Sequence, residues 1–286
     1  MPSSQQIRCR PIEAPDLEVV VDLLTRGFPD RTRKYWATAL EVLAARERLP
    51  GLPQFGYALA ADGAVVGVHL LIFHRRGDGR EAPVQCNTSA LYVDPRYQSY
   101  AALLVSIASK LKNVIYLNTT ASKHTWPLLE ALGYRRYSEG QFVSIPALAG
   151  GAATKVLPLG DCAEHPALSD YALLRAHAEA GCLALVCETA RGPIPFVFLR
   201  RRIAYAPIGV MQLVYCRDTA DFVSLAGPLG RVLVSRGATC VILDADGPIP
   251  GLPGCFFRNK TPRYFKGPYK PRQNDLAFTE MVLFGP

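Results

Sequence analysis

The sequence predicts a mixed α+β fold (class α/β) of two similar halves, each a twisted, mostly antiparallel sheet flanked by helices. One observation is the order strand, helix, strand, helix between Val84 and Tyr134. Apolar residues alternate there through Leu91 and Val93 and then recur at helical spacing from Ala101, so a strand leads into a helix. The second observation is that a similar order of elements returns in the C-terminal half.

The residues before Val84 are predicted to form a strand, two helices and a hairpin. The hairpin turns at Asp62 and Gly63, because an Asp-Gly pair between apolar runs favours a tight turn. The first helix has acidic residues early and Arg26 late, as the helix dipole prefers. The strand, the two helices and the hairpin are expected at residues 7–12, 14–28, 31–48 and 55–73.

A second, diverged copy of this unit is predicted after the small-residue linker LAGGAAT. We therefore expect an N-terminal domain over residues 1–147 and a C-terminal domain over residues 148–286. After Asp246 the chain is too rich in proline and glycine for the closing helix of the first half. We expect a loop over residues 258–272 instead.

The composition indicates a folded protein with a substantial core and a basic surface. The 286 residues are 49% hydrophobic, and the net charge of +8 favours an acidic or anionic partner. The best apolar run, around residues 65–73, is too short to cross a bilayer, and the first residues contain no apolar signal core. We therefore expect a cytoplasmic protein without a membrane span. The eight cysteines include no CxxC pair, so we expect buried thiols and no metal site.

The stretch around Pro95 resembles the GNAT superfamily of acyl-CoA-dependent acyltransferases. In that family a strand with an apolar-x-Val-x-Pro ending leads into a phosphate-holding helix start written Gln/Arg-x-x-Gly-x-Gly/Ala. A second strand and helix follow and close on Leu-Gly-Phe/Tyr. The residues that carry the resemblance are Leu91, Val93, Pro95, Tyr97, Gln98, Leu132, Gly133 and Tyr134. The resemblance extends over residues 7 to about 147 and implies acyl-CoA as a co-substrate, with no prosthetic group.

The sequence departs from the family pattern at several positions. Ala101 and Leu103 replace the two glycines of the helix start and crowd the backbone where a pyrophosphate would approach. Asn87 stands where many relatives carry a carboxylate base, and Leu129 where relatives often place a Tyr that protonates the leaving thiolate. Ser122 replaces the Asn that usually opens the second helix. The resemblance therefore implies the fold more fully than the catalytic residues.

A GNAT-like site acts mainly by positioning its substrates. The resemblance implies that the thioester lies where two parallel strands separate, that the Leu91 N–H polarises its carbonyl and that Val93 hydrogen-bonds the pantetheine arm. The alternative for both residues is an ordinary strand role. We also expect the helix start at Gln98 to offer unpaired N–H groups to anions, because the helix contains no acidic residue. The matching start in the second half carries Asp218 and Asp221, which would repel a pyrophosphate. The expected donor-binding residues are Leu91, Val93, Gln98, Ser99, Tyr100, Ala101 and Ser122.

The sequence contains no clear general base. Asn87 can orient an acceptor or a water but cannot take a proton, so the base lies elsewhere or the amine arrives deprotonated. The catalytic candidates are therefore Asn87 and Leu91, with Asp244, Asp246 and Glu280 as possible bases. For Glu280 the alternative is a strand residue that points to water, and for His124, a further candidate, it is an exposed histidine.

Acceptor-binding residues are expected on the second strand and in the basic loop of the C-terminal half. Tyr116 and Asn118 lie on that strand, and the alternative for Tyr116 is a core aromatic. Residues 258–272 hold six basic side chains between aromatic ones, so Tyr264 and Lys266 could bind an anionic acceptor. The alternative is a solvated loop with its aromatics against the sheet. The loop resembles no nucleic-acid module, and we expect no nucleic-acid partner.

The leading hypothesis is an N-acyltransferase. It would move an acyl group from acyl-CoA, or from an acyl carrier protein, to an amine of a small anionic acceptor. The alternative is a degenerate, non-catalytic relative that binds CoA or a nucleotide as a sensor or interaction module, because the glycines, the carboxylate and the tyrosine are missing. Donor binding with thiol release indicates the enzyme, and binding without release indicates the sensor.

Overall fold

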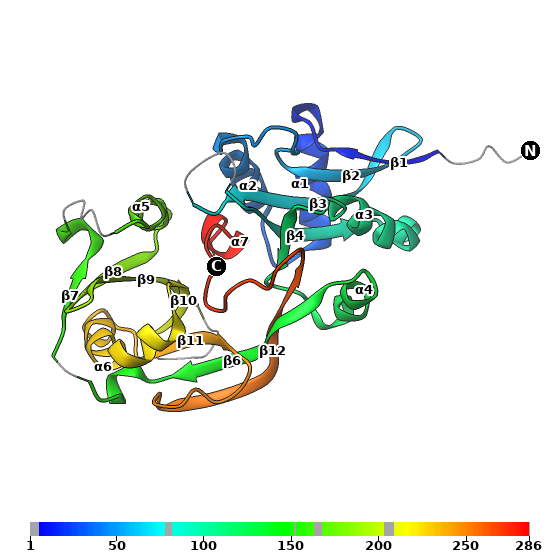
Figure 1. Ribbon diagram of the computed structural model, residues 1–286. Coiled ribbons are helices and arrows are strands. Elements are labelled where there is room, and N and C mark those ends of the chain that lie inside the picture. Colours follow the sequence, from blue (N-terminus) through cyan, green and yellow to red (C-terminus); the bar gives the residue numbers. More distant parts are fainter. Residues whose placement is uncertain (1–5, 78–81, 152, 163–167, 203–208, 286) are drawn as a thin grey trace, which may run out of the picture. The chain divides into compact units, whose positions relative to one another are not determined.

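The computed structural model describes residues 6–77, 82–151, 153–162, 168–202 and 209–285 (Figure 1). The chain forms two compact units. Unit 1 consists of Met1–Arg135 and Tyr264–Lys270, and unit 2 of Arg136–Arg263 and Pro271–Pro286. These ranges differ from the predicted division after residue 147, because a strand that begins at Arg135 belongs to the sheet of unit 2 and a C-terminal segment returns to unit 1.

Unit 1 is a mixed sheet with helices on both faces, as predicted. Its strands are β1 (Ile7–Pro11), β2 (Gly56–Ala61), β3 (Ala64–Arg75), β4 (Val84–Val93), β5 (Val114–Asn118) and the end of β12 (Gly254–Lys266), in that spatial order. Its helices are α1 (Leu17–Gly27), α2 (Arg33–Ala45), α3 (Ala101–Ala108) and α4 (Trp126–Ala131). Neighbouring strands are antiparallel, apart from the parallel pair β4 and β5. β3 is buried continuously from Val66 to Phe73, as expected of a strand covered on both faces.

The α3 helix packs on strands β2, β3 and β4 of the sheet. Its buried residues Leu104 and Val105 pack on side chains of β2, β3 and β4, among them Leu59, Leu71 and Cys86. A 3-10 helix, η2 (Pro95–Tyr100), connects β4 to α3. The end of β4 and the start of α3 are therefore held close together by the core of unit 1.

The C-terminal segment that was predicted as a loop over residues 258–272 is largely strand β12, so that prediction is wrong. Its residues Tyr264–Lys266 pair antiparallel with β5. Pro262 and the left-handed backbone at Asn259 and Thr261 explain the error, because these features are typical of loops and turns.

Unit 2 repeats the arrangement of strands around a parallel pair. Its strands lie in the order β12, β6 (Arg135–Ser144), β11 (Cys240–Ala245), β10 (Val210–Cys216), β9 (Gly192–Arg201), β8 (Leu183–Thr189) and β7 (Lys155–Pro158). Its helices are α5 (Tyr171–Glu179), α6 (Thr219–Ser235) and α7 (Glu280–Leu283). β10 and β11 run parallel, as β4 and β5 do in unit 1.

The long helix α6 packs closely on the linker that precedes β7. A Cβ atom at Gly230 would lie 2.2 Å from the backbone nitrogen of Ala147, so only glycine fits this approach. No helix within the described ranges is long and apolar enough to cross a membrane.

Candidate functional site

The candidate site of unit 1 lies where β4 and β5 separate. The two strands pair from Val84 with Val114 to Asn87 with Leu117, and no further pair is formed among the described residues although β4 continues to Val93. Just beyond this point β4 contains one more residue than the facing part of β3, which makes a β-bulge between Thr88 and Leu91. A bulge bends its strand, so β4 diverges from β5, and the break in strand pairing beside Leu91 is called the gap below.

Polar side chains lie at the point where β4 and β5 stop pairing. Thr88 Oγ1 donates a hydrogen bond to the Leu117 carbonyl at 3.0 Å, and Thr119 Oγ1 donates to Asn87 Oδ1 at 3.1 Å. Asn87, Thr88 and Thr119 are all fully buried. The bond from Thr119 helps to hold the orientation of the Asn87 amide. Thr88 and Thr119 were not predicted as site residues, and their proximity to Asn87 and Asn118 in sequence was the only available signal.

The part of β4 beyond the apex presents backbone groups to the gap. The Asp94 N–H donates to the Val66 carbonyl of β3 at 2.8 Å. Because N–H groups alternate sides along a strand, the N–H groups of Leu91 and Val93 face away from β3 and toward the gap. Residues 89–92 are only half-buried, whereas β3 beside them is buried. This part of β4 is therefore partly exposed.

The β5 side of the gap carries small polar groups. Asn118 ends β5, and its Oδ1 is buried with no hydrogen-bond partner among the residues that the structure describes. Ser122 and His124 follow in an exposed turn, with Ser122 Oγ 3.3 Å from His124 Nε2. The predicted residues Asn87, Leu91, Val93, Asn118 and Ser122 thus lie along the two strands that border the gap and on the turn after β5.

At the helix start near Gln98, where unpaired N–H groups were predicted, three of the N–H groups have partners within the chain. The chain forms the 3-10 helix η2 before α3, and the Arg96 N–H donates to the Asp94 carboxylate at 3.1 Å. The Tyr97 N–H donates to the Asp94 carbonyl, and the Ala101 N–H donates to the Gln98 carbonyl. Asp94 precedes the acid-free stretch, and its role as a cap was not predicted.

In unit 2 the corresponding gap is occupied by the protein's own chain. β10 and β11 pair only as far as Gln212 with Ile242 and then separate. The Leu276 N–H donates to the Val214 carbonyl at 2.7 Å, and the Cys216 N–H donates to the Asn274 carbonyl at 3.2 Å. The C-terminal segment 274–276, called the C-terminal insert below, therefore adds to β10 as a short strand. As a result β10 is buried along its whole length, unlike β4.

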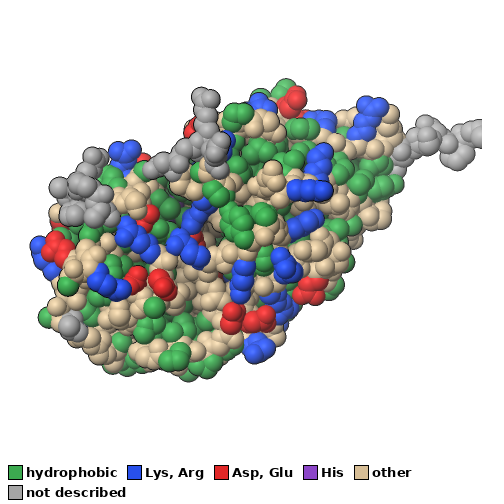
Figure 2. Space-filling view, viewed as in Figure 1, with side chains coloured by type: hydrophobic (Ala, Val, Ile, Leu, Met, Phe, Trp, Pro, Cys, Tyr) green, Lys and Arg blue, Asp and Glu red, His purple; other side chains and the backbone are tan. Residues whose placement is uncertain are grey.

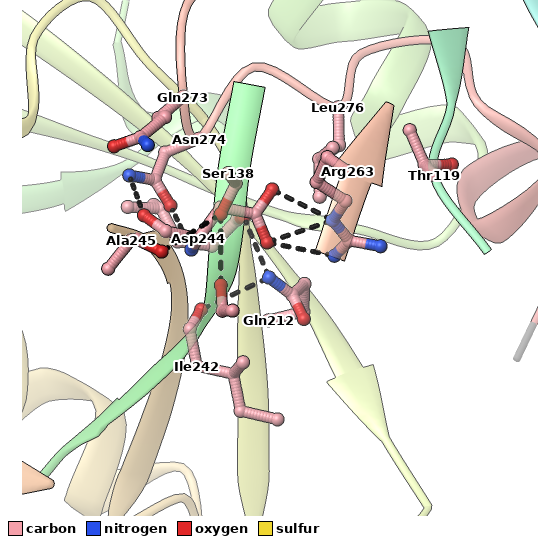
Figure 3. A network of polar contacts seen from close by, with 12 residues as sticks. Thr119, Ser138, Gln212, Ile242, Asp244, Ala245, Arg263, Gln273, Asn274 and Leu276 are labelled. Carbon is pink, nitrogen blue, oxygen red and sulfur yellow. Dashed lines mark hydrogen bonds and ion pairs between the residues drawn. The ribbon is translucent and has the colours of Figure 1, made fainter. Parts of the chain in front are cut away.

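The side chain of Asn274 fixes the C-terminal insert (Figure 3). Its Oδ1 accepts from the Asp244 N–H at 2.7 Å, and its Nδ2 donates to the Asp244 carbonyl at 3.1 Å and to Thr219 Oγ1 at 3.0 Å. Asn274 thus joins the end of β11 to the start of α6. Sequence reasoning missed this residue, because nothing in the local pattern of RQNDL relates it to either element.

Comparisons with solved structures agree with this architecture. A GCN5-related N-acetyltransferase from Anabaena variabilis superposes with a TM-score of 0.59 at 10% identity, over 91% of this chain and 72% of that one. A GCN5-related N-acetyltransferase from Kribbella flavida gives a TM-score of 0.54 at 15% identity, over 91% and 71%. A conserved protein from Enterococcus faecalis gives 0.56 at 12% identity, over 95% and 73%. The chain has the fold of the GCN5-related N-acetyltransferases. No protein-family model matches the sequence, and no curated protein does.

The GNAT fold is present in both units, and the candidate bases from the C-terminal half belong to unit 2. The Asp244 carboxylate forms a fully buried ion pair with Arg263, with Nε–Oδ1 and Nε–Oδ2 distances of 3.0 Å and an Nη2–Oδ1 distance of 2.9 Å. Burial raises the pKa of Asp244, and the Arg263 guanidinium opposes that rise. A carboxylate held in this way is not free to accept a proton from an amine. Asp246 Oδ1 accepts from the Glu139 N–H, and Glu280 begins α7 rather than lying on a strand.

Three predicted acceptor-binding residues have structural contacts inside unit 1. Tyr116 is buried, and its hydroxyl accepts from the Leu111 N–H, while burial raises its pKa. The Tyr264 hydroxyl donates to Glu130 Oε1 at 2.9 Å, and Lys266 Nζ lies 3.4 Å from Ser109 Oγ. Tyr264 is also fully buried, so it cannot stack on an acceptor as proposed from sequence. The core alternative describes Tyr116 and Tyr264 better than the binding role.

Proposed function

We propose that the protein transfers an acyl group from a pantetheine thioester, supplied by acyl-CoA or an acyl carrier protein, to an amine of a small anionic acceptor. The observation that carries the proposal is the gap between β4 and β5 in unit 1, with the N–H groups of Leu91 and Val93 directed into it. A thioester arm in this gap would pair with β4 through its amide groups. The likeness in fold to N-acetyltransferases from other organisms supports this reading.

The residues of the gap would act by position and by hydrogen bonding. The Leu91 N–H would donate to the thioester carbonyl oxygen, which gains negative charge as the amine nitrogen attacks the carbon. The C–N bond forms, the C–S bond breaks, the nitrogen loses a proton and the leaving thiolate gains one. Asn87 would orient the acceptor or a water, since an amide cannot take the proton. His124, which contacts Ser122 in the exposed segment after β5, would be a candidate to accept it.

The surface charge supports an anionic acceptor. The chain carries 32 Lys and Arg against 24 Asp and Glu residues. Figure 2 shows basic side chains distributed over the visible face, with acidic side chains among them. A net positive protein attracts anionic ligands over the range of the Debye length.

A thiol-release assay tests the proposal, with acetyl-CoA and acetyl-pantetheine as donors and a panel of amino acids, amino sugars and polyamines as acceptors. We expect acceptor-dependent release of thiol. Leu91→Pro removes the N–H that faces the gap and should lower kcat/KM by about 100-fold, the usual effect of losing one oxyanion donor. Leu91→Ala keeps the N–H and should retain most of the activity. Equal losses in the two variants, with both folded, would contradict the role of this N–H.

A non-catalytic binding module is the second candidate. It is favoured by the engaged amides of η2 and by the amide Asn87 at the position of the expected base. Such a module would bind a thioester and show a thermal shift but release no thiol with any amine of the panel.

A further inference from the structure

Asn118 places a hydrogen-bond acceptor at the point where β4 and β5 stop pairing. The two strands pair as far as Asn87 with Leu117, so Asn118 is the first residue of β5 beyond the paired part. The residue is partly exposed, but its side-chain Oδ1 is buried and has no hydrogen-bond partner among the residues that the structure describes. A buried oxygen without a donor lowers stability, and native proteins contain few such atoms.

The hydroxyl groups near Asn118 donate to other acceptors. Thr88 Oγ1 donates to a backbone carbonyl of β5 at 3.0 Å, and Thr119 Oγ1 donates to a side chain of β4 at 3.1 Å. Tyr264, which lies directly opposite Asn118 on β12, donates its hydroxyl proton to Glu130 Oε1 at 2.9 Å. A hydroxyl group has one proton to donate, so none of the three can also donate to Asn118 Oδ1.

A ligand that completes this oxygen has to supply an N–H or O–H group. The amine of the proposed reaction carries N–H groups, and a hydrogen bond through one of them leaves the nitrogen lone pair free to attack the thioester carbon. The nitrogen gains positive charge as the C–N bond forms, which makes its N–H a stronger donor. The bond to Asn118 would therefore strengthen from the bound substrate to the transition state, as a contact that increases kcat must.

We propose that Asn118 Oδ1 accepts a hydrogen bond from the attacking amine, and that this contact selects primary amines. The inference rests on the proposed function. The C–N bond forms, the C–S bond breaks, one proton leaves the nitrogen for solvent and the thiolate gains one. A primary amine has two N–H groups, so one stays on Asn118 while the other is lost. A secondary amine has only one N–H, and Asn118 cannot take that proton because its side chain is a neutral amide.

Steady-state kinetics of the full chain test the inference, with acetyl-CoA as donor and each amine of the panel compared with its N-methyl analogue. We expect the natural chain to use the primary amines with a kcat/KM at least tenfold higher. Asn118→Leu should lower kcat/KM for the primary amines by about 10- to 100-fold, the usual effect of losing one hydrogen bond to a charged group. The preference over the N-methyl analogues should fall toward one, and the KM of acetyl-CoA should stay within twofold.

The melting temperature of the same variant separates binding from folding. Leucine has nearly the shape of asparagine and no polar atom, so Asn118→Leu should melt at the same temperature as the natural chain or higher. A lower melting temperature would show that the natural side chain has a partner within the protein, which contradicts the inference. Asn113→Leu, at the exposed turn before β5, is the matched control and should leave all kinetic constants unchanged.

The remaining outcomes also decide the question. If kcat/KM for the primary amines, or the preference for them, is unchanged in Asn118→Leu, the amine does not contact Asn118. If only the KM of acetyl-CoA rises, the oxygen serves the donor. Either result overturns the inference and leaves the proposed function in place. If the natural chain releases no thiol with any amine of the panel, the proposed function itself fails, which is a distinct result.

Discussion

The ion pair between Asp244 and Arg263 shows how a single buried charge can serve structure rather than catalysis. Both side chains are completely buried and make three close contacts. Removing a charge from water is costly, and a close partner recovers that cost only while both members are present. The acid that the sequence offers as a base therefore belongs to the framework of unit 2.

Loss of Arg263 is accordingly expected to be severe. Arg263→Leu leaves the Asp244 carboxylate buried and unpaired, which should lower the free energy of unfolding by about 3 to 5 kcal/mol. The double variant Asp244→Leu with Arg263→Leu should recover most of this loss. The exposed pair of Lys155 and Glu188 is the control, and Lys155→Ala should cost less than about 1 kcal/mol. Urea unfolding measures all three, and a double variant no more stable than Arg263→Leu would contradict the account.

His69 is a second buried group whose charge state matters. It is directly opposite Leu91 on β3, and burial lowers its pKa to about 4 from 6.5. Between these two values the unfolded chain binds a proton that the folded chain does not, so stability falls as the pH falls from 6.5 to 4. The difference corresponds to about 3 kcal/mol at pH 4.

Replacing His69 should remove this part of the pH dependence. His69→Leu is expected to flatten the free energy of unfolding between pH 6.5 and 4. Unfolding curves at five or more pH values provide the comparison. An unchanged slope in His69→Leu would show that His69 is protonated in the folded state.

At the scale of elements, the parallel pairs β4–β5 and β10–β11 both separate after a few residues, but only the second pair has another segment of the chain beside the separated strands. In unit 1 the part of β4 beyond its pairing with β5 is half-buried. In unit 2 the corresponding part of β10 is covered by the C-terminal insert. The insert turns at Asn274, whose φ of +58° is left-handed and whose side chain makes three buried hydrogen bonds. The Asn274 side chain therefore helps the backbone bonds to β10 to hold the insert in this gap.

A comparison of two asparagines tests the role of the insert. Asn274→Ala loses the buried bonds as well as the left-handed preference, and should lower the free energy of unfolding by about 3 kcal/mol. Asn259→Ala loses a left-handed asparagine too, since φ is +58° there, but that residue is exposed and accepts one bond from Arg136. It should cost about 1 kcal/mol. Similar losses for the two would mean that the insert contributes little.

Much of the element order could be predicted from sequence, because it depends on periodicity. The strand at Val84–Val93, the following helix and the second strand are confirmed, as are the two GNAT-like halves. The boundary of the first helix could not be predicted, since η2 depends on the Asp94 cap and not on apolar spacing. β12 was missed because its strand character comes from pairing with β5, which overrides the preference of Pro262 for a loop.

The candidate site was predictable only where a side chain lies on one of the two separating strands. Asn87, Leu91, Val93 and Asn118 do so. Asp244 and Tyr264 were misassigned because sequence shows residue type but not the partners Arg263 and Glu130, which come from distant segments. The C-terminal insert could not be foreseen for the same reason.

At the scale of the whole molecule, chain order and unit membership differ. Residues Tyr264–Lys270 belong to unit 1, although the rest of the C-terminal segment belongs to unit 2. The strand that pairs with β5, β12, is therefore the last strand in the sequence. Each unit consists of two separate segments of the chain.

Hydrogen exchange at individual amides, measured by NMR with and without saturating acetonyl-pantetheine, tests most directly whether the gap of unit 1 binds the donor arm. In the free protein, Leu91 and Val93 should exchange faster than Cys216, which donates to the C-terminal insert. The probe should slow exchange at Leu91 and Val93 by at least tenfold and leave Cys216 unchanged. Binding of the probe with no protection at either β4 amide would contradict the account.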